Sequence, residues 1–124
     1  MPDKVVDASA LAAIAFAEPG ADMVIDEIDG HRLHAPALVV FELMNVAWKR
    51  AKKQPAATAL FLEALGVLDG LGLRFRGIDQ DEVVRLGLAT GLTAFDATYL
   101  WLARALGMPL VTLDKKLGAH AKNG

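Results

Sequence analysis

Residues 4–17, KVVDASALAAIAFA, decide the fold class of this chain. A short apolar run ends in Asp7, and Ser9 then begins an alanine-rich pattern that is broken by EPG at 18–20. A short apolar run with a polar end favours a strand, whereas a longer apolar pattern behind a capping residue favours a helix. The stretch therefore predicts a strand that passes directly into a helix at a carboxylate.

The rest of the chain continues this alternation. Further strands are predicted at 31–35, 73–78 and 110–113, and further helices at 22–28, 36–53, 58–72, 79–90, 93–106 and 114–120. Strands separated by helices long enough to cross over predict a parallel sheet covered on both faces, with right-handed connections. The predicted fold is α/β and doubly wound, a three-layer α/β/α domain with a central parallel sheet of four or five strands. The length suits one domain, residues 1–124.

Composition indicates which partners and which cellular compartment to expect. Hydrophobic residues make up 54% of the chain and mean hydropathy is +0.35, so we expect apolar surface to face another subunit or chain. The chain has no cysteine, which excludes disulfides, CxxC zinc sites and thiol catalysis and fits a reducing cytoplasm. The apolar stretch 8–17 is far shorter than the ~20 residues that span a bilayer. We interpret it as a buried helix and expect no membrane partner.

Glu42 lies inside the apolar run LVVFELMNVAW (38–48). Burying a carboxylate costs several kcal/mol, so Glu42 must reach solvent, find a hydrogen-bond donor or meet a cation. Asn45 and Lys49 follow at i+3 and i+7 and make one polar stripe on this helix. We expect a helix this apolar to be mostly buried, and its stripe to face a polar crevice.

Such a crevice is expected at the carboxyl ends of the strands, where open α/β sheets bind ligands. Asp7 and Asp114 each follow a predicted strand, and Asp96 begins a late helix. Helix capping is the alternative for all three, since Asp7 or Ser9, Asp114, and the box that Thr93 starts fit capping positions. If these acids converge with Glu42, they raise one another's pKa unless a cation is present. Oxygen ligands alone suit Mg²⁺ or Mn²⁺, which promote phosphoryl displacement by water.

The net charge is −2, so the surface as a whole is not basic, and positive charge is found only in local clusters. One basic cluster contains Lys49 and Arg50 with two further lysines, and another contains Lys115 and Lys116. Each cluster is consistent with a solvated helix end or with binding of RNA phosphates.

Four stretches together resemble the acidic motifs of PIN-domain nucleases in order and spacing. They are VVDASAL, FELMNVAW, TAFDATYLWLA and PLVTLD, and their closest resemblance is to VapC-type toxins of toxin–antitoxin pairs. The resemblance covers essentially the whole chain and implies an endoribonuclease that cuts RNA with metal-activated water. It implies Asp7 and Asp96 as the principal Mg²⁺ ligands, with Glu42 and Asp114 completing the acidic pocket. Ser9, Asn45 and Thr112 would orient those carboxylates or bound water.

The same resemblance implies two protein partners. One is a cognate antitoxin whose C-terminal segment covers the site, and the other is a second copy of the chain in a homodimer. The family usually has a further edge strand after the last acidic helix, whereas this sequence ends in GAHAKNG. We therefore expect a fifth strand to be short or absent.

Two other functions are compatible with the acidic pattern. A phosphoreceiver domain also binds Mg²⁺ at a doubly wound sheet, but it needs a phosphoacceptor Asp after a mid-chain strand. Residues 49–62, KRAKKQPAATALFL, contain no Asp and no predicted strand. A PIN-like module kept only for binding is the second alternative, and the presence of all four acids favours catalysis over it.

Overall fold

Four parallel strands form the centre of the molecule. The computed structural model describes residues 3–122. The strands are β1 (Asp3–Val6), β2 (Arg32–Ala35), β3 (Arg74–Phe75) and β4 (Leu110–Val111), in the order β3-β2-β1-β4. All neighbouring pairs are parallel, as predicted.

The two outer strands are shorter than the sequence pattern predicted. β4 pairs with Val5 and Val6, and β1 ends there because Asp7 turns the chain into the first helix. Beyond Val111 no strand remains for β4 to pair with. β3 pairs only with β2, and one further backbone bond, from Arg76 to Ala35, ends the ladder. Within residues 3–122 there is no fifth strand.

Helices occupy most of the remaining chain. They are α1 (Ala8–Ala15), α2 (Ala21–Ile28), α3 (Leu38–Lys53), α4 (Thr58–Val67), α5 (Gln80–Thr90), α6 (Ala94–Leu106) and α7 (Lys115–Lys122), with 3₁₀ turns at Pro55–Ala57 and Leu68–Leu71. The helix predicted to begin at Pro36 begins two residues later. The helix predicted over 58–72 tightens into a 3₁₀ turn after Val67.

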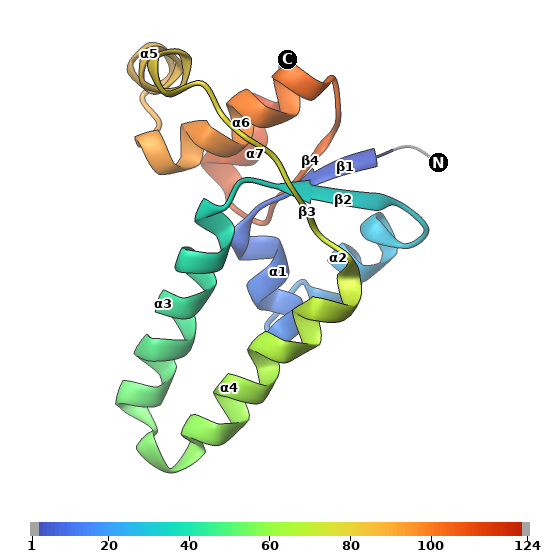
Figure 1. The fold of residues 1–124 in the computed structure, drawn as a ribbon, viewed down its shortest axis with the longest axis vertical. Helices are drawn as coiled ribbons and strands as arrows, with labels where there is room; N and C mark the ends of the chain where they lie inside the picture. The colour runs from blue at the N-terminus through green and yellow to red at the C-terminus, as the bar shows by residue number, and fades with distance from the viewer. Residues whose placement is uncertain (1–2, 123–124) are drawn as a thin grey trace.

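Helices cover both faces of the sheet, which gives the predicted three layers. In Figure 1, α1, α2, α3 and α4 lie on one side of the strands, and α5, α6 and α7 lie on the other. Neighbouring residues of β1 pack on opposite faces of the sheet. Val5 packs against Leu102 and Ala103 of α6, whereas Val6 belongs to the larger core with Leu11 of α1. α3 and α4 form an antiparallel hairpin that extends away from the sheet (Figure 1).

The expectation that α3 is mostly buried is wrong. Only Val39, Leu43 and Ala47 are buried along it. Phe41 is 64% exposed and Trp48 is 58% exposed. The reason is that α3 belongs to an outer layer, so only one of its faces can contact the core. The other face is an apolar surface, in keeping with the high hydropathy of the chain. Within the described residues, no helix has both the length and the apolar character needed to cross a membrane.

Candidate active site

Asp7 stands where β1 passes into α1, and it is only 4% exposed. Its Oδ1 accepts hydrogen bonds from the Ser9 hydroxyl at 2.8 Å and from the Ala10 amide at 3.0 Å, so Asp7 caps α1. Its Oδ2 accepts a hydrogen bond from the Thr112 hydroxyl. Asp7 thus has a capping role and also lies among the other predicted site residues.

Ser9 and Thr112 tie the ends of β1 and β4 together. Their hydroxyl oxygens lie 3.3 Å apart. The Ser9 hydroxyl accepts from the Leu113 amide at 2.9 Å, and the Thr112 hydroxyl accepts from the Asp114 amide at 3.0 Å. Ser9 and Thr112, two of the three predicted supporting residues, therefore contact Asp7, and the network fixes the orientation of its carboxylate.

Glu42 is half-buried on α3 and has found a donor. The hydroxyl of Tyr99 on α6 donates a hydrogen bond to its Oε1. Tyr99 is 1% exposed, and burial together with the carboxylate raises the pKa of its phenol. Sequence reasoning missed this pair. The one feature of the sequence that could have indicated a role for Tyr99 is its position at i+3 from Asp96, on the same side of the helix.

Asp96 and Asp114 are the more accessible acids. Asp96 lies in the first turn of α6, but Thr93 caps that helix by accepting the Asp96 amide at 3.2 Å, so the Asp96 carboxylate is not the N-cap. Asp114 is exposed and caps α7 by accepting the Leu117 amide at 2.8 Å. Lys116 donates to the Gly91 carbonyl at 2.9 Å. The pKa of Asp96 is raised, mainly by burial and by the charge of Asp114, and the positive charge of Lys116 offsets part of that rise.

The four acids lie close enough for their charges to act on one another. Burial raises the pKa of Asp7, and the charge of Asp114 raises it further. The pKa of Glu42 is also raised, first by burial and then by the charges of Asp96 and Asp7. Burial likewise raises the pKa of Asp96, and the charge of Asp114 raises it further. The charge of Asp114 therefore disfavours the ionised forms of Asp7 and Asp96, and the charges of Asp7 and Asp96 disfavour that of Glu42.

This arrangement fits a hydrated divalent cation. All the available side-chain ligands are carboxylate and hydroxyl oxygens, and a bound cation would remove the mutual repulsion. Within residues 3–122, no three His, Asp or Glu side chains form a ready-made ligand cage. Mg²⁺ does not require one, because it keeps several waters and is held by one or two carboxylates together with substrate phosphate.

A groove of about 320 Å³ between α1 and α3 adjoins Glu42. Glu42 and the exposed Asn45 line one wall, and Ser9 lines the other. Glu18 also lines this groove, and sequence reasoning missed it, since it had served only to mark the end of a helix. Its carboxylate forms an ion pair with Arg50.

The predicted RNA-binding residues differ in their surroundings. Lys49 and Lys115 are exposed. Arg50 is paired with Glu18, and its guanidinium lies 5.0 Å above the centre of the Phe16 ring, so much of its interaction capacity is already used within the fold. Lys116 lies close enough to Asp96 to affect its charge.

Several known proteins are similar to this chain in sequence or in structure. The PIN domain family matches residues 4–123. Ribonuclease VapC3 of Pyrobaculum aerophilum is 30% identical over 118 residues, which cover 91% of this chain and 90% of that protein. Exonuclease VapC9 of the same organism is 33% identical over 119 residues, covering 94% and 84%. The crystal structure of PAE2754 from Pyrobaculum aerophilum matches with a TM-score of 0.78 at 32% identity, over 96% of this chain and 84% of that one. The chain belongs to the PIN-domain family and, within it, to the VapC type.

Proposed function

We propose that this protein is a metal-dependent endoribonuclease that acts as the toxin of a toxin–antitoxin pair. The observation that supports the proposal is the network near the ends of β1 and β4, in which Thr112 joins Asp7 to the Asp114 backbone, and Tyr99, from the helix that carries Asp96, bonds Glu42. The relatives named ribonuclease and exonuclease support a nuclease. The VapC names support the presence of a cognate antitoxin and an RNA substrate.

Asp7 and Asp96 would hold Mg²⁺ or Mn²⁺, with Glu42 and Asp114 completing the pocket. Such an ion supplies positive charge that acidifies a bound water and stabilises the charge of an in-line phosphoryl displacement. Hydrogen bonds within the chain orient two of these carboxylates for such an ion. Ser9 and Thr112 fix Asp7, and Tyr99 occupies one oxygen of Glu42 and leaves the other for bound water.

The alternatives are less compatible with the fold. A phosphoreceiver would need an Asp at the carboxyl end of a mid-chain strand, but Pro36 follows β2 and Arg76 follows β3. A non-catalytic PIN-like module would share the geometry and differ only in activity, so activity is the discriminating measurement.

We also propose a homodimer and an antitoxin as protein partners. The exposed apolar face of α3, which includes Phe41 and Trp48, is the surface that supports a stable partner. Size-exclusion chromatography with light scattering of the chain alone gives the oligomeric state. A monomer would contradict the homodimer and leave the antitoxin as the partner to be sought.

The central experiment is cleavage of an RNA panel with Mg²⁺ or Mn²⁺ and with EDTA. We expect cleavage only with metal, and its loss in Asp96→Asn. A circular RNA in the panel separates internal cleavage from cleavage at an end. Purified wild type that leaves every RNA intact with either metal would favour the binding module. Metal-independent cleavage, or full activity of Asp96→Asn, would contradict the proposed chemistry.

A further inference from the structure

Three arginines share one face of the sheet at its β3 edge. Arg32 lies on β2, Arg74 lies on β3, and Arg76 follows β3 directly. His34 is the register partner of Arg74, and side chains alternate along strands, so Arg32, His34, Arg74 and Arg76 point to the same side. All three arginines are exposed, and we call them the edge arginines.

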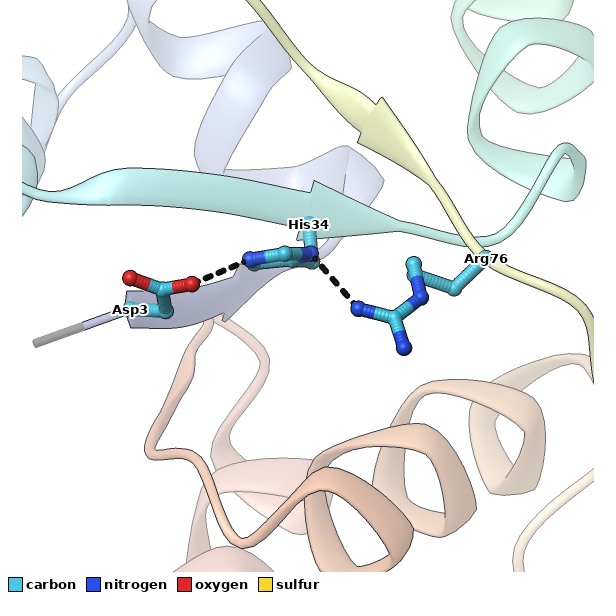
Figure 2. Close-up of polar contacts among 3 residues, drawn as sticks. All are labelled: Asp3, His34 and Arg76. Atoms are coloured by element: carbon cyan, nitrogen blue, oxygen red, sulfur yellow. Dashed lines mark hydrogen bonds and ion pairs between the residues drawn. The ribbon is translucent and has the colours of Figure 1, made fainter.

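A buried histidine holds one of these arginines. Figure 2 shows His34 between Asp3 and Arg76. The His34 Nε2 lies 2.7 Å from the Asp3 carboxylate, and Arg76 Nη1 lies 3.4 Å from the His34 Nδ1. His34 is 2% exposed. One assignment satisfies both contacts: Nε2–H donates to Asp3, and Nδ1 accepts from Arg76.

Within residues 3–122, none of the edge arginines is neutralised by an ion pair with a carboxylate. Asp3 lies close enough to Arg32 and Arg74 for their charges to act on it, and it is already bonded to His34. That bond lowers the pKa of Asp3, and the charges of Arg32 and Arg74 lower it further. Within residues 3–122, no carboxylate lies at ion-pair distance from Arg76. The patch is therefore cationic on a chain whose net charge is −2.

We infer that the edge arginines bind phosphates of the RNA strand beside the acidic site. Arg76 leaves the carboxyl end of β3, and Asp7 and Asp114 follow the carboxyl ends of β1 and β4, which lie at the same end of this parallel sheet. From there the patch continues through Arg74 and Arg32 across the face of the sheet. Guanidinium groups suit this role because their planar donors match phosphate oxygens. The inference rests on the proposed function, since it supplies a path for the same substrate.

Protection of the sheet edge is the competing explanation, since charged side chains on edge strands prevent pairing with other chains. That role needs charge but no fixed orientation. Here His34, which is buried and bonded to Asp3, holds Arg76 in place, which reduces the side-chain entropy lost when Arg76 binds a ligand.

The test compares two double variants for binding of a 20-nucleotide single-stranded RNA in EDTA. Arg74→Ala with Arg76→Ala removes two edge arginines, and Arg85→Ala with Arg104→Ala removes two exposed arginines from α5 and α6 as the control. We expect Kd to rise about tenfold at low salt in the edge variant, and the slope of log K against log salt to fall by about 0.7 for each lost contact. The control should match wild type. Equal effects in the two variants would overturn the inference.

His34 is tested as a positioning residue by His34→Leu, which removes the acceptor for Arg76. We expect weaker RNA binding in the wild-type background and no further weakening in Arg76→Ala, a non-additivity that general destabilisation does not produce. If His34→Leu does not fold, the double variants still decide the inference. Cleavage separates the two proposals: KM should rise in the edge variant with kcat unchanged. Wild type that binds RNA without cutting it contradicts the proposed function alone, and cleavage with unchanged KM in the edge variant contradicts this inference alone.

Discussion

At the scale of single residues, Glu42 shows what the sequence could and could not reveal. Its position in an apolar helix predicted that a partner must exist, and the partner is the hydroxyl of Tyr99. Local pattern could not identify it, because 57 residues separate the two and only the folded chain brings them together. The same holds for Thr112, which reaches Asp7 across 105 residues.

Glu42→Gln should separate stability from activity. Glutamine can still accept from Tyr99 but carries no charge toward Asp7 and Asp96. Since Glu42 is half-buried, we expect metal-free stability to stay level or rise by at most about 1 kcal/mol after solvent screening. RNA cleavage at saturating Mg²⁺ should fall on the order of a hundredfold or more, because the carboxylate no longer orients bound water. Urea unfolding and single-turnover cleavage measure the two quantities. A Gln variant as active as wild type would remove Glu42 from the site.

Asp96→Asn should abolish most of the response to metal. A ligand that binds only the folded state, present at 100 times its Kd, stabilises that state by about 2.7 kcal/mol. Mg²⁺ or Mn²⁺ should therefore raise the Tm of wild type and raise that of the variant much less. Calorimetry with and without metal measures this, with Asp79→Asn, at the cap of α5, as a control that should respond like wild type. Equal shifts in wild type and Asp96→Asn would show that Asp96 holds no metal.

At the scale of elements, the sequence predicted the order and type of strands and helices well but placed their ends poorly. The predicted strand 110–113 is only two residues long in the sheet, because β1 turns into α1 at Asp7 and provides no further partner. Strand length thus depends on a neighbour distant in sequence. The burial of α3 was also predicted wrongly, since composition does not indicate that a helix has only one covered face.

The basic end of α3 gives a prediction in which adjacent residues differ. Lys49 is exposed, so Lys49→Ala should weaken RNA binding and flatten its salt slope by about 0.7. Arg50 is engaged with Glu18 and the Phe16 ring, so Arg50→Ala should instead cost stability, about 0.5–1 kcal/mol. RNA titrations at several salt concentrations and urea unfolding measure both effects. A larger RNA-binding loss from Arg50→Ala than from Lys49→Ala would reverse these assignments.

At the scale of the whole molecule, we expect the acids of the site to make stability fall as the pH rises above their ordinary pKa values. Asp7, Glu42 and Asp96 have raised pKa values in the folded state, so the folded protein binds more protons than the unfolded chain once the pH exceeds their ordinary values. The stability of the metal-free protein should then be greatest near the ordinary carboxyl values, about pH 4, and fall as the pH rises through the folded values. Asp3 has a lowered pKa and acts oppositely, losing its contribution only as the pH falls below that range.

Melting in EDTA between about pH 4 and pH 8 tests this dependence. We expect the Tm to decline with rising pH, and the decline to be smaller in Glu42→Gln with Asp96→Asn, which removes two of the three groups. Saturating Mg²⁺ should flatten the wild-type curve at the upper end. A Tm that rises steadily across this range in EDTA would mean that mutual repulsion of the acids does not govern stability.

The hydrogen bond between Thr112 and Asp7 has a consequence for biosynthesis. Contacts between residues distant in sequence form late, because a long loop must close before they can stabilise anything. β1 is made first, yet Asp7 cannot receive its Thr112 partner until the segment around β4 has left the ribosome. For most of translation the nascent chain therefore has its first carboxylate but no assembled site. We therefore expect the proposed nuclease activity to be absent from the nascent chain and to begin only when β4 joins β1.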